Sequence, residues 1–180
     1  FQGTIQCDAY QAYQSYQRAR GKDAINLAGC FAHVRRKFFD AHHIGLDKVF
    51  NDEILGLIRK IYYIEKELRE ANAPPERRRE IRQSESKPIM ESMENALRQR
   101  ANEKGYLPQS KTGKAVTYAL NQWDRLQKYL EDGRIEIDNN LVENKIRPTK
   151  LGAKNWLFFG SAEAGHRSAV FFSLITSCKN

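Results

Sequence analysis

Four side chains between residues 139 and 147 have types and spacing suited to binding or cleaving a phosphodiester. Asn139, Asn140, Glu143 and Arg147 share one face if this stretch is helical, so one carboxylate is surrounded by two amides and a guanidinium. Two ordinary interpretations compete with a catalytic one. Asn140 and Glu143 have the spacing of a helix capping box, and Glu143 with Arg147 has the spacing of an i,i+4 ion pair.

A second carboxylate with a suggestive position is Asp8, which follows a strand-like stretch at residues 3–8. Carboxylates that come from strand ends and from distant elements suit a hard divalent cation such as Mg²⁺, which prefers oxygen ligands. Two such ions can activate a water or a 3′-hydroxyl and stabilise the leaving oxygen of a phosphodiester. Asp8 and Glu143 are too few for that site, so a third carboxylate is expected from elsewhere. The alternative for Asp8 is a turn residue that ends a strand.

The elements that must position Asp8 are predicted to be two strands and a helix. Residues 3–8 and 24–30 are strand candidates, and the tyrosines between them have helical spacing. A strand-helix-strand order implies a parallel pair, which normally belongs to a larger sheet with covered faces. Two strands cannot form such a sheet, so the remaining strands are expected to come from elsewhere. Residues 134–137 read as a further strand-like stretch that leads into a helix of two turns, which Pro148 ends.

The region between these segments is predicted to be helical. From 47 to 71 the apolar residues alternate spacings of four and three, as in a coiled-coil seam; they are Phe50, Ile54, Leu57, Ile61, Ile64 and Leu68. A charged helix follows from about Glu76 and restarts at Pro88. Another helix ends at Gly133, which is assigned the usual C′ role. We therefore expect an antiparallel helical hairpin or small bundle, inserted between the second strand and the segment that begins at Asp138.

The C-terminal part is predicted to contain a loop and a buried helix. Residues 150–160 form a basic and aromatic stretch bounded by glycines, and Ser161 is suited to cap a final helix. The run 169–175 is apolar nearly all round. A helix of this kind is normally buried, so we expect it to pack against the sheet.

Composition limits the classes of function. The chain has 180 residues, 41% of them hydrophobic, and a formal net charge of +8, which favours a polyanionic partner. The three cysteines, Cys7, Cys30 and Cys178, are too few for a disulfide framework and indicate a reducing compartment. No apolar run is long enough to span a membrane, and no signal peptide opens the chain, which begins at Phe1 as if cut from something longer.

Four blocks of the sequence resemble a known family. The blocks are QCDAYQAY at 6–13, GCFAHVRRKF at 29–38, DNNLVENKIRP at 138–148 and GAKNWLFFGS at 152–161. Their order and spacing are similar to those of bacterial insertion-sequence transposases of the IS66 type. The resemblance covers both ends of the chain, and the helical region between them is the variable part. The family usually has Asp-Gly-Tyr where this chain has Asp8-Ala9-Tyr10.

The resemblance implies a fold. The expected class is α+β and predominantly helical, with a partial RNase H-like α/β core at 1–45 and 134–180 and an inserted antiparallel helical subdomain at 46–133. Asp8 and Glu143 would be the second and third residues of an Asp-Asp-Glu triad that binds Mg²⁺ or Mn²⁺. The first aspartate of the family lies upstream of Phe1, so the core lacks its first strands and the isolated chain is expected to be inactive.

The resemblance also implies a function and partners. The intact parent would be an enzyme that hydrolyses phosphodiesters at transposon ends and transfers the strands to target DNA. Its partners would be DNA and further copies in a homodimer or synaptic assembly, in the bacterial cytoplasm at the nucleoid. Two rivals remain: a non-catalytic basic helical module that binds DNA or a partner helix, and an RNase H-like nuclease unrelated to transposition.

Residues near the four blocks are candidate DNA contacts, because basic and amide side chains bind phosphates largely without regard to sequence. The candidates are His33, Arg35, Arg36, Asn139, Asn140, Arg147, Lys150, Lys154, Asn155, Trp156 and Arg167. Zinc is not expected at Cys30 and His33, because a structural zinc needs four ligands. His33 either orients the scissile strand or is a partly buried structural histidine. Trp156 either stacks on an unpaired base or packs in a core.

Overall fold

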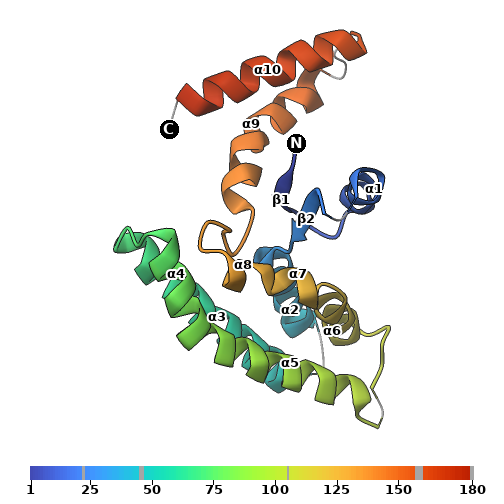
Figure 1. The fold of residues 1–180 in the computed structure, drawn as a ribbon. Coiled ribbons are helices and arrows are strands. Elements are labelled where there is room, and N and C mark those ends of the chain that lie inside the picture. Colours follow the sequence, from blue (N-terminus) through green and yellow to red (C-terminus); the bar gives the residue numbers. More distant parts are fainter. Residues whose placement is uncertain (22, 45–46, 105, 157–159, 179–180) are drawn as a thin grey trace. The chain divides into compact units, whose positions relative to one another are not determined.

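The computed structural model describes residues 1–21, 23–44, 47–104, 106–156 and 160–178. The chain divides into two compact units, Phe1–Asn139 and Asn140–Asn180, and each is described here by itself. Helices make up most of both units, which confirms the predominantly helical α+β class (Figure 1). No helix in the described part of the chain combines the length and apolar character needed to cross a membrane.

The first unit begins with the predicted parallel strand pair. Strand β1 spans Gly3–Gln6, strand β2 spans Ile25–Ala28, and helix α1 spans Gln11–Arg20 between them. The register pairs Gly3 with Ile25 and Gln6 with Ala28, so both carboxyl ends lie at the same edge. The Cys7 N–H extends the ladder by donating to the Ala28 carbonyl at 3.0 Å. Within the described residues the sheet has these two strands.

The rest of the first unit is a series of helices. Their bounds are α2 Phe31–Ile44, α3 Lys48–Glu70, α4 Pro75–Ile81, the π-helix η1 Arg82–Ser86, α5 Lys87–Asn102, α6 Lys111–Asn121, α7 Trp123–Leu126 and α8 Lys128–Glu131. Helix α4 continues through η1 into α5, and Pro88, which has no N–H to donate, lies directly after the π-helical stretch in the first turn of α5.

One hydrophobic core joins α2 to the helices that follow it. Its buried members include Phe31 and Phe38 from α2, Ile54 from α3 and Met93 from α5, and residues from α6 to α8 complete it. The predicted stripe on α3 is confirmed at four positions, since Ile54, Ile61, Ile64 and Leu68 are buried. The other buried positions of α3 are Asn51, Ile58 and Glu65, whereas the predicted Phe50 and Leu57 are half-buried, so the seam drifts from a strict heptad as a straight α-helix does.

Two predictions for the end of this unit are wrong. Residues 134–137 form no strand, because their backbone groups bond to side chains of other elements instead of a neighbouring strand. Gly133 does not have the positive φ of a C′ glycine. A Cβ at this position would lie 1.9 Å from the Pro75 carbonyl oxygen, so close packing on the start of α4 requires the glycine.

The second unit contains helices α9, Asn140–Trp156, and α10, Ala162–Cys178. The predicted helix end at Pro148 is wrong, because Pro148 lies inside α9; the ring removes one N–H bond, and the flanking residues continue the helix. Residues 150–156 are therefore helical rather than a loop, while 157–159 lie outside the described residues. Ser161 accepts from the Ala164 N–H at 3.1 Å, as expected of a cap.

Within the second unit helix α10 leaves much of its apolar run exposed, and its packing against the sheet, which belongs to the first unit, stays a prediction. It has no buried residue among those described, and Val170, Phe171, Leu174 and Ile175 are exposed. A cavity between α9 and α10 is lined by Phe172, Ser173, Thr176 and Ser177 on α10 and by Leu141, Val142, Lys145 and Ile146 on α9.

Candidate active site

Asp8 lies two residues beyond the carboxyl end of β1 and is half-buried. Its Oδ1 accepts a hydrogen bond from the Tyr10 N–H at 2.9 Å, which closes a turn after the strand. Asp8 therefore has the local role of a turn residue. That bond occupies one of about four lone-pair sites on a carboxylate, so a cation-binding role is compatible with it.

The segment 132–139 reaches the same edge of the sheet. The Gln6 side-chain amide donates to the Glu136 carbonyl at 2.5 Å and to the Gly29 carbonyl at 3.3 Å. The Phe31 N–H donates to the Ile137 carbonyl at 3.1 Å. Residues from the start and the end of the first unit thus meet where β1 and β2 end.

Asp138 is held at this edge by a residue of the helical region. The Tyr62 hydroxyl on α3 donates to Asp138 Oδ2 at 2.6 Å. Burial and the neighbouring Asp138 carboxylate together raise the pKa of Tyr62 far above its ordinary value, so the phenol remains a proton donor. Asp138 is the first residue of the DNNLVEN block, and Tyr62 links that block to α3.

Cys30 and Asn139 are also in contact at this edge. Burial raises the pKa of Cys30, and the N–H groups of Asn139, His33 and Ala32 partly oppose this by donating to the sulfur. Asn139 Oδ1 is buried without a hydrogen-bond partner among the described residues, which leaves an unused acceptor beside Asp138. Burial likewise raises the pKa of Cys7 to about 11. Both thiols are therefore protonated at neutral pH.

Tyr118 on α6 is a neighbour of Asp8 that the sequence did not reveal. Its hydroxyl accepts from the Ala9 N–H, and burial followed by the Asp8 charge raises the pKa of Tyr118 to about 12. The Lys37 ammonium lies 4.5 Å from the centre of the Tyr118 ring. A cation from α2 is thus held close to the turn that contains Asp8.

The predicted DNA contacts of the first unit lie on helix α2 and at residue 139, where the unit ends. His33 is half-buried in the first turn of α2, and Arg35 and Arg36 are exposed on the same helix. Asn139 is the last residue of this unit. The exposed guanidiniums are available to an external anion, as the prediction requires.

The remaining predicted residues belong to the second unit. Asn140 begins α9, Glu143 is half-buried in its first turn, and Arg147 and Lys150 are exposed further along. Exposed Arg167 lies on α10, 3.8 Å from Glu163. Lys154, Asn155 and Trp156 fall in the last turn of α9, but their side chains lie outside the described residues. The distance between Asp8 and Glu143, which belong to different units, stays a prediction.

A buried ion pair between α3 and η1 was missed by the sequence analysis. Arg82 donates from Nε and Nη2 to the two oxygens of Glu65, both at 2.7 Å, and neither side chain is exposed. The available signal was Glu65 itself, which lies four positions after Ile61 and three before Leu68 on the buried face of α3. A charged residue at such a position requires a buried partner.

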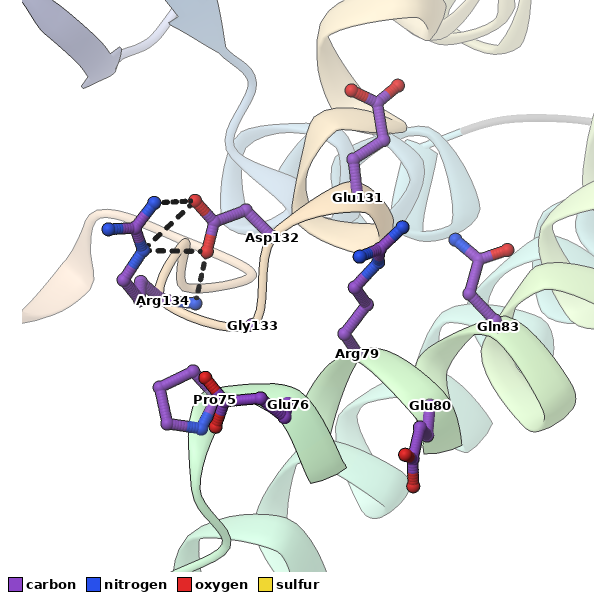
Figure 2. Close-up of a pocket in the computed structure, with 9 residues that line it drawn as sticks. All are labelled: Pro75, Glu76, Arg79, Glu80, Gln83, Glu131, Asp132, Gly133 and Arg134. Carbon is purple, nitrogen blue, oxygen red and sulfur yellow. Dashed lines mark hydrogen bonds and ion pairs between the residues drawn. The ribbon is translucent and has the colours of Figure 1, made fainter.

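The cavity between the start of α4 and the turn at 131–134 has different chemistry (Figure 2). Its volume is about 620 Å³, and acidic side chains outnumber the two arginines, Arg79 and Arg134, that line it. Arg134 bonds Asp132 at 2.7 Å, and this pairing lowers the pKa of Asp132 to about 2. This cavity is therefore poorly suited to DNA phosphates.

The possible metal ligands near the sheet edge are carboxylate and amide oxygens of Asp8, Asp138 and Asn139, the type of ligand that a hard cation prefers. Among the described residues, however, no group of three or more His, Cys, Asp or Glu side chains is arranged to hold a metal ion. The edge thus offers oxygen ligands without forming a complete metal site by itself.

Comparison with known proteins gives one family and three relatives. The model described as the Transposase IS66 family matches residues 1–167. Uncharacterized proteins y4qI and y4jD of Sinorhizobium fredii (strain NBRC 101917 / NGR234) are each 38% identical over 183 residues, covering 99% of this chain and 33% and 35% of theirs. Uncharacterized protein y4hP of the same strain is 30% identical over 190 residues, covering 98% of this chain and 34% of its own. The chain thus spans about a third of these relatives. No solved structure gives a significant match.

Proposed function

This chain belongs to the IS66 family of transposases, and on that basis we propose that it is part of the catalytic domain of a DNA transposase. Asp8 and Glu143 are the second and third carboxylates of an Asp-Asp-Glu triad. The first carboxylate comes from a segment upstream of Phe1, in keeping with relatives about three times as long as this chain. The observation that supports the proposal best is that Gln6 and the Phe31 N–H bond the carbonyls of residues 136 and 137, so the stretch that leads to Asp138 returns to the sheet edge where β1 leads into Asp8.

The fold proposed for this domain is RNase H-like. Strands β1 and β2 with α2 would belong to its core, together with 134–180, and residues 46–133 would be an insertion. Two facts support this division. The pair is parallel with its functional residue at the carboxyl end, and residues 136 and 137 return to that end after the helices have been completed. Parallel strands of this type need covering elements and further strands.

The metal ions proposed for this site are Mg²⁺ or Mn²⁺. When bound, such ions lower the pKa of an attacking water or hydroxyl and stabilise the leaving oxygen. Asp8 and Glu143 would hold them through carboxylate oxygens, and Asn139 Oδ1 is a free acceptor that can bind a coordinated water. Asp138 would remain bonded to Tyr62 and thereby fix the position of this segment.

Two phosphoryl transfers follow from this assignment. In hydrolysis, a water oxygen bonds to phosphorus while the bond to the 3′ oxygen of the transposon strand breaks, and that oxygen takes up a proton. In strand transfer, the resulting 3′-hydroxyl loses its proton and its oxygen bonds to a target phosphorus, whose own 3′ oxygen leaves. The chain's residues contribute by holding the reacting phosphate in line.

Arg35 and Arg36 on α2, and Arg147, Lys150 and Arg167 in the second unit, are proposed phosphate contacts. All are exposed, and the formal net charge of +8 favours DNA as the partner. Lys154, Asn155 and Trp156 extend this set by family resemblance, with His33, Asn139 and Asn140 contributing at the site. Binding through such contacts weakens steeply as salt increases.

The experiment uses the intact protein and a plasmid containing its gene with flanking DNA. Asp8→Asn and Glu143→Gln should each lower Mg²⁺-dependent strand cleavage at least about a hundredfold, while DNA affinity in a gel-shift assay is unchanged. Glu53→Gln, which alters an exposed carboxylate on α3, is the control and should cleave normally.

Cleavage that survives both substitutions would instead support the rival function, a non-catalytic basic module that binds DNA or a partner. Cleavage that is lost with them but shows no preference for the gene's flanking DNA would indicate an RNase H-like nuclease unrelated to transposition.

A further inference from the structure

We infer that Tyr62 and Arg82 are positioning residues, and that α3 and η1 clamp the segment 129–138 so that Asp138 and Asn139 are fixed at the carboxyl edge of the sheet. This inference rests on the proposed function for its catalytic consequence. The clamp itself follows from contacts within the first unit, and it assigns a task to the helical region between the two catalytic blocks.

Arg82 forms the centre of the clamp. Its Nη1 donates to three backbone carbonyls, those of Tyr129 at 2.8 Å, Asp132 at 3.1 Å and Ile135 at 2.9 Å. Its guanidinium also lies over the Tyr129 ring, 5.1 Å from the centre. One buried side chain thus hydrogen-bonds a carbonyl of α8 and two carbonyls of the irregular stretch that follows it. The guanidinium can do this because Nη1 remains available to the carbonyls while Nε and Nη2 bond Glu65.

Two further side chains extend the clamp on either side of Arg82. Arg78 on α4 donates to Glu65 at 3.3 Å and to Glu136 at 2.9 Å, which ties residue 136 to α3. The Gln83 amide on η1 donates to the Leu130 carbonyl at 2.9 Å. The π-helical stretch 82–86 contains Arg82 and Gln83, and π-helical turns are frequent at functional positions.

Tyr62 forms the final contact of the clamp, and the sheet supplies the opposite one. Tyr62 bonds Asp138 from α3, while Gln6 and the Phe31 N–H bond residues 136 and 137 from the strands and α2. Residues 134–138 form neither strand nor helix, so these bonds determine their conformation. Asn140, which begins α9, follows two residues after Asp138, and Glu143 lies in the first turn of that helix.

Stability alone does not account for this arrangement. Replacing a buried ion pair by apolar residues of similar volume is often neutral or stabilising, so Glu65 and Arg82 are not required for a stable core. The bonds of Arg82 to three carbonyls, in contrast, have no apolar substitute. They specify the path of the chain between α8 and Asp138, which is the property a catalytic segment needs.

The test is Tyr62→Phe in the intact protein, followed by amide hydrogen exchange. Removing the hydroxyl should raise exchange in residues 134–139 about tenfold, as expected for one lost bond to a charged group, while exchange in α5 and α6 is unchanged. Tyr63→Phe is the matched control, since Tyr63 is the exposed neighbour of Tyr62 on α3. It should leave exchange in 134–139 unchanged.

A second variant, Arg82→Lys, retains the charge beside Glu65 and loses Nη1, the atom that bonds the three carbonyls. It should raise the amide exchange rates of residues 129–138 more than those of the rest of the first unit. Unchanged exchange in both variants, or a uniform rise across the unit, overturns the clamp. Hydrogen exchange does not depend on cleavage. The clamp can therefore be tested even if the cleavage assays contradict the catalytic assignment of Asp8 and Glu143.

The catalytic consequence is measured with the same Tyr62→Phe protein. Strand cleavage should fall about tenfold with DNA affinity unchanged, because the bond to Asp138 positions the segment and does not contact DNA. In a double-mutant cycle with Asp138→Asn, the second substitution should add little to the first. Independent, additive losses would show that Tyr62 does not act through Asp138.

Discussion

The Arg82 guanidinium and the Glu65 carboxylate face each other in a bidentate pair, with Nε to Oε1 and Nη2 to Oε2 both at 2.7 Å and neither side chain exposed. Glu65 belongs to α3 and Arg82 to η1, so the pair joins the two helical segments that enclose the chain between α8 and Asp138. Removing two charges from water costs free energy, and the attraction between the two side chains offsets that cost only while both are present.

Breaking this pair should be strongly destabilising. Glu65→Gln leaves the buried Arg82 charge without a counter-ion, and Arg82→Met leaves Glu65 with Arg78 as its remaining cation and removes the bonds to three carbonyls, so each should lower the free energy of unfolding by about 3–5 kcal/mol. Denaturant titration followed by circular dichroism measures this. Glu94→Gln, which alters an exposed i,i+4 pair with Arg98, is the control and should cost less than about 1 kcal/mol. Equal losses in both positions would contradict the account.

Gly133 should not tolerate a methyl group. In Gly133→Ala the new Cβ would meet the Pro75 carbonyl 1.9 Å away, and forcing the backbones apart should cost about 1–3 kcal/mol. Gly56→Ala is the matched control, because it adds the same group in open space on α3. It should stabilise the protein by about 0.5–1 kcal/mol through helix propensity. A stabilising Gly133→Ala would show that 133 and 75 are not in close contact.

The three thiols should differ sharply in reactivity. Cys7 and Cys30 are buried, whereas Cys178 is exposed at the end of α10. A disulfide reagent at about pH 8 should therefore modify one thiol of the native chain rapidly and all three after denaturation. In Cys178→Ser the rapid reaction should disappear. Rapid modification of Cys7 would place that residue at an accessible surface.

Stability should decline at alkaline pH in part through Cys7. Burial raises the pKa of Cys7 from 9.0 to about 11, so the unfolded chain ionises this thiol first. The folded state binds more protons in that window, and the free energy of unfolding falls as pH rises from 9.0 to about 11. Cys7→Ala should make this slope shallower in denaturant titrations at several pH values. An unchanged slope would contradict the burial of this thiol.

Ser110 should act as the N-cap of α6. Its Oγ accepts from the Gly113 N–H at 2.9 Å, so Ser110→Ala should cost about 1 kcal/mol. Ser92→Ala is the control, because the exposed Ser92 hydroxyl bonds only back to the Pro88 carbonyl within α5. That change should be neutral or slightly stabilising, as measured by thermal unfolding.

The parts of this fold that sequence could predict are those with a regular period. The parallel pair followed from a strand-helix-strand order and the buried stripe on α3 from the spacing of apolar residues, whereas the capping role of Ser161 followed from its residue type. The family followed from four blocks at the correct spacing, and the match to residues 1–167 confirms it. Local chemistry alone gave Asp8 two possible roles, and the turn with Tyr10 is now observed.

The parts that failed depend on contacts between distant residues. Arg134–Ile137 alternates like a strand, but Arg82 and Gln6 bind its carbonyls in place of a neighbouring strand. Arg82 lies in a strongly charged stretch and resembles a solvated residue until Glu65 is known to be its partner. The effect of Pro148 was overestimated, because one missing bond does not end a helix whose other residues favour it.

The bond between the Gln6 amide and the Glu136 carbonyl has a consequence for how the chain is made. The two residues are far apart, and at ordinary translation speeds the first leaves the ribosome roughly ten seconds before the second is synthesised. During that interval the helices that follow β2 are synthesised, whereas the Gln6 side chain still lacks its partner at residue 136. The sheet edge therefore gains the bond between Gln6 and Glu136 only after helices α2 to α8 have been synthesised.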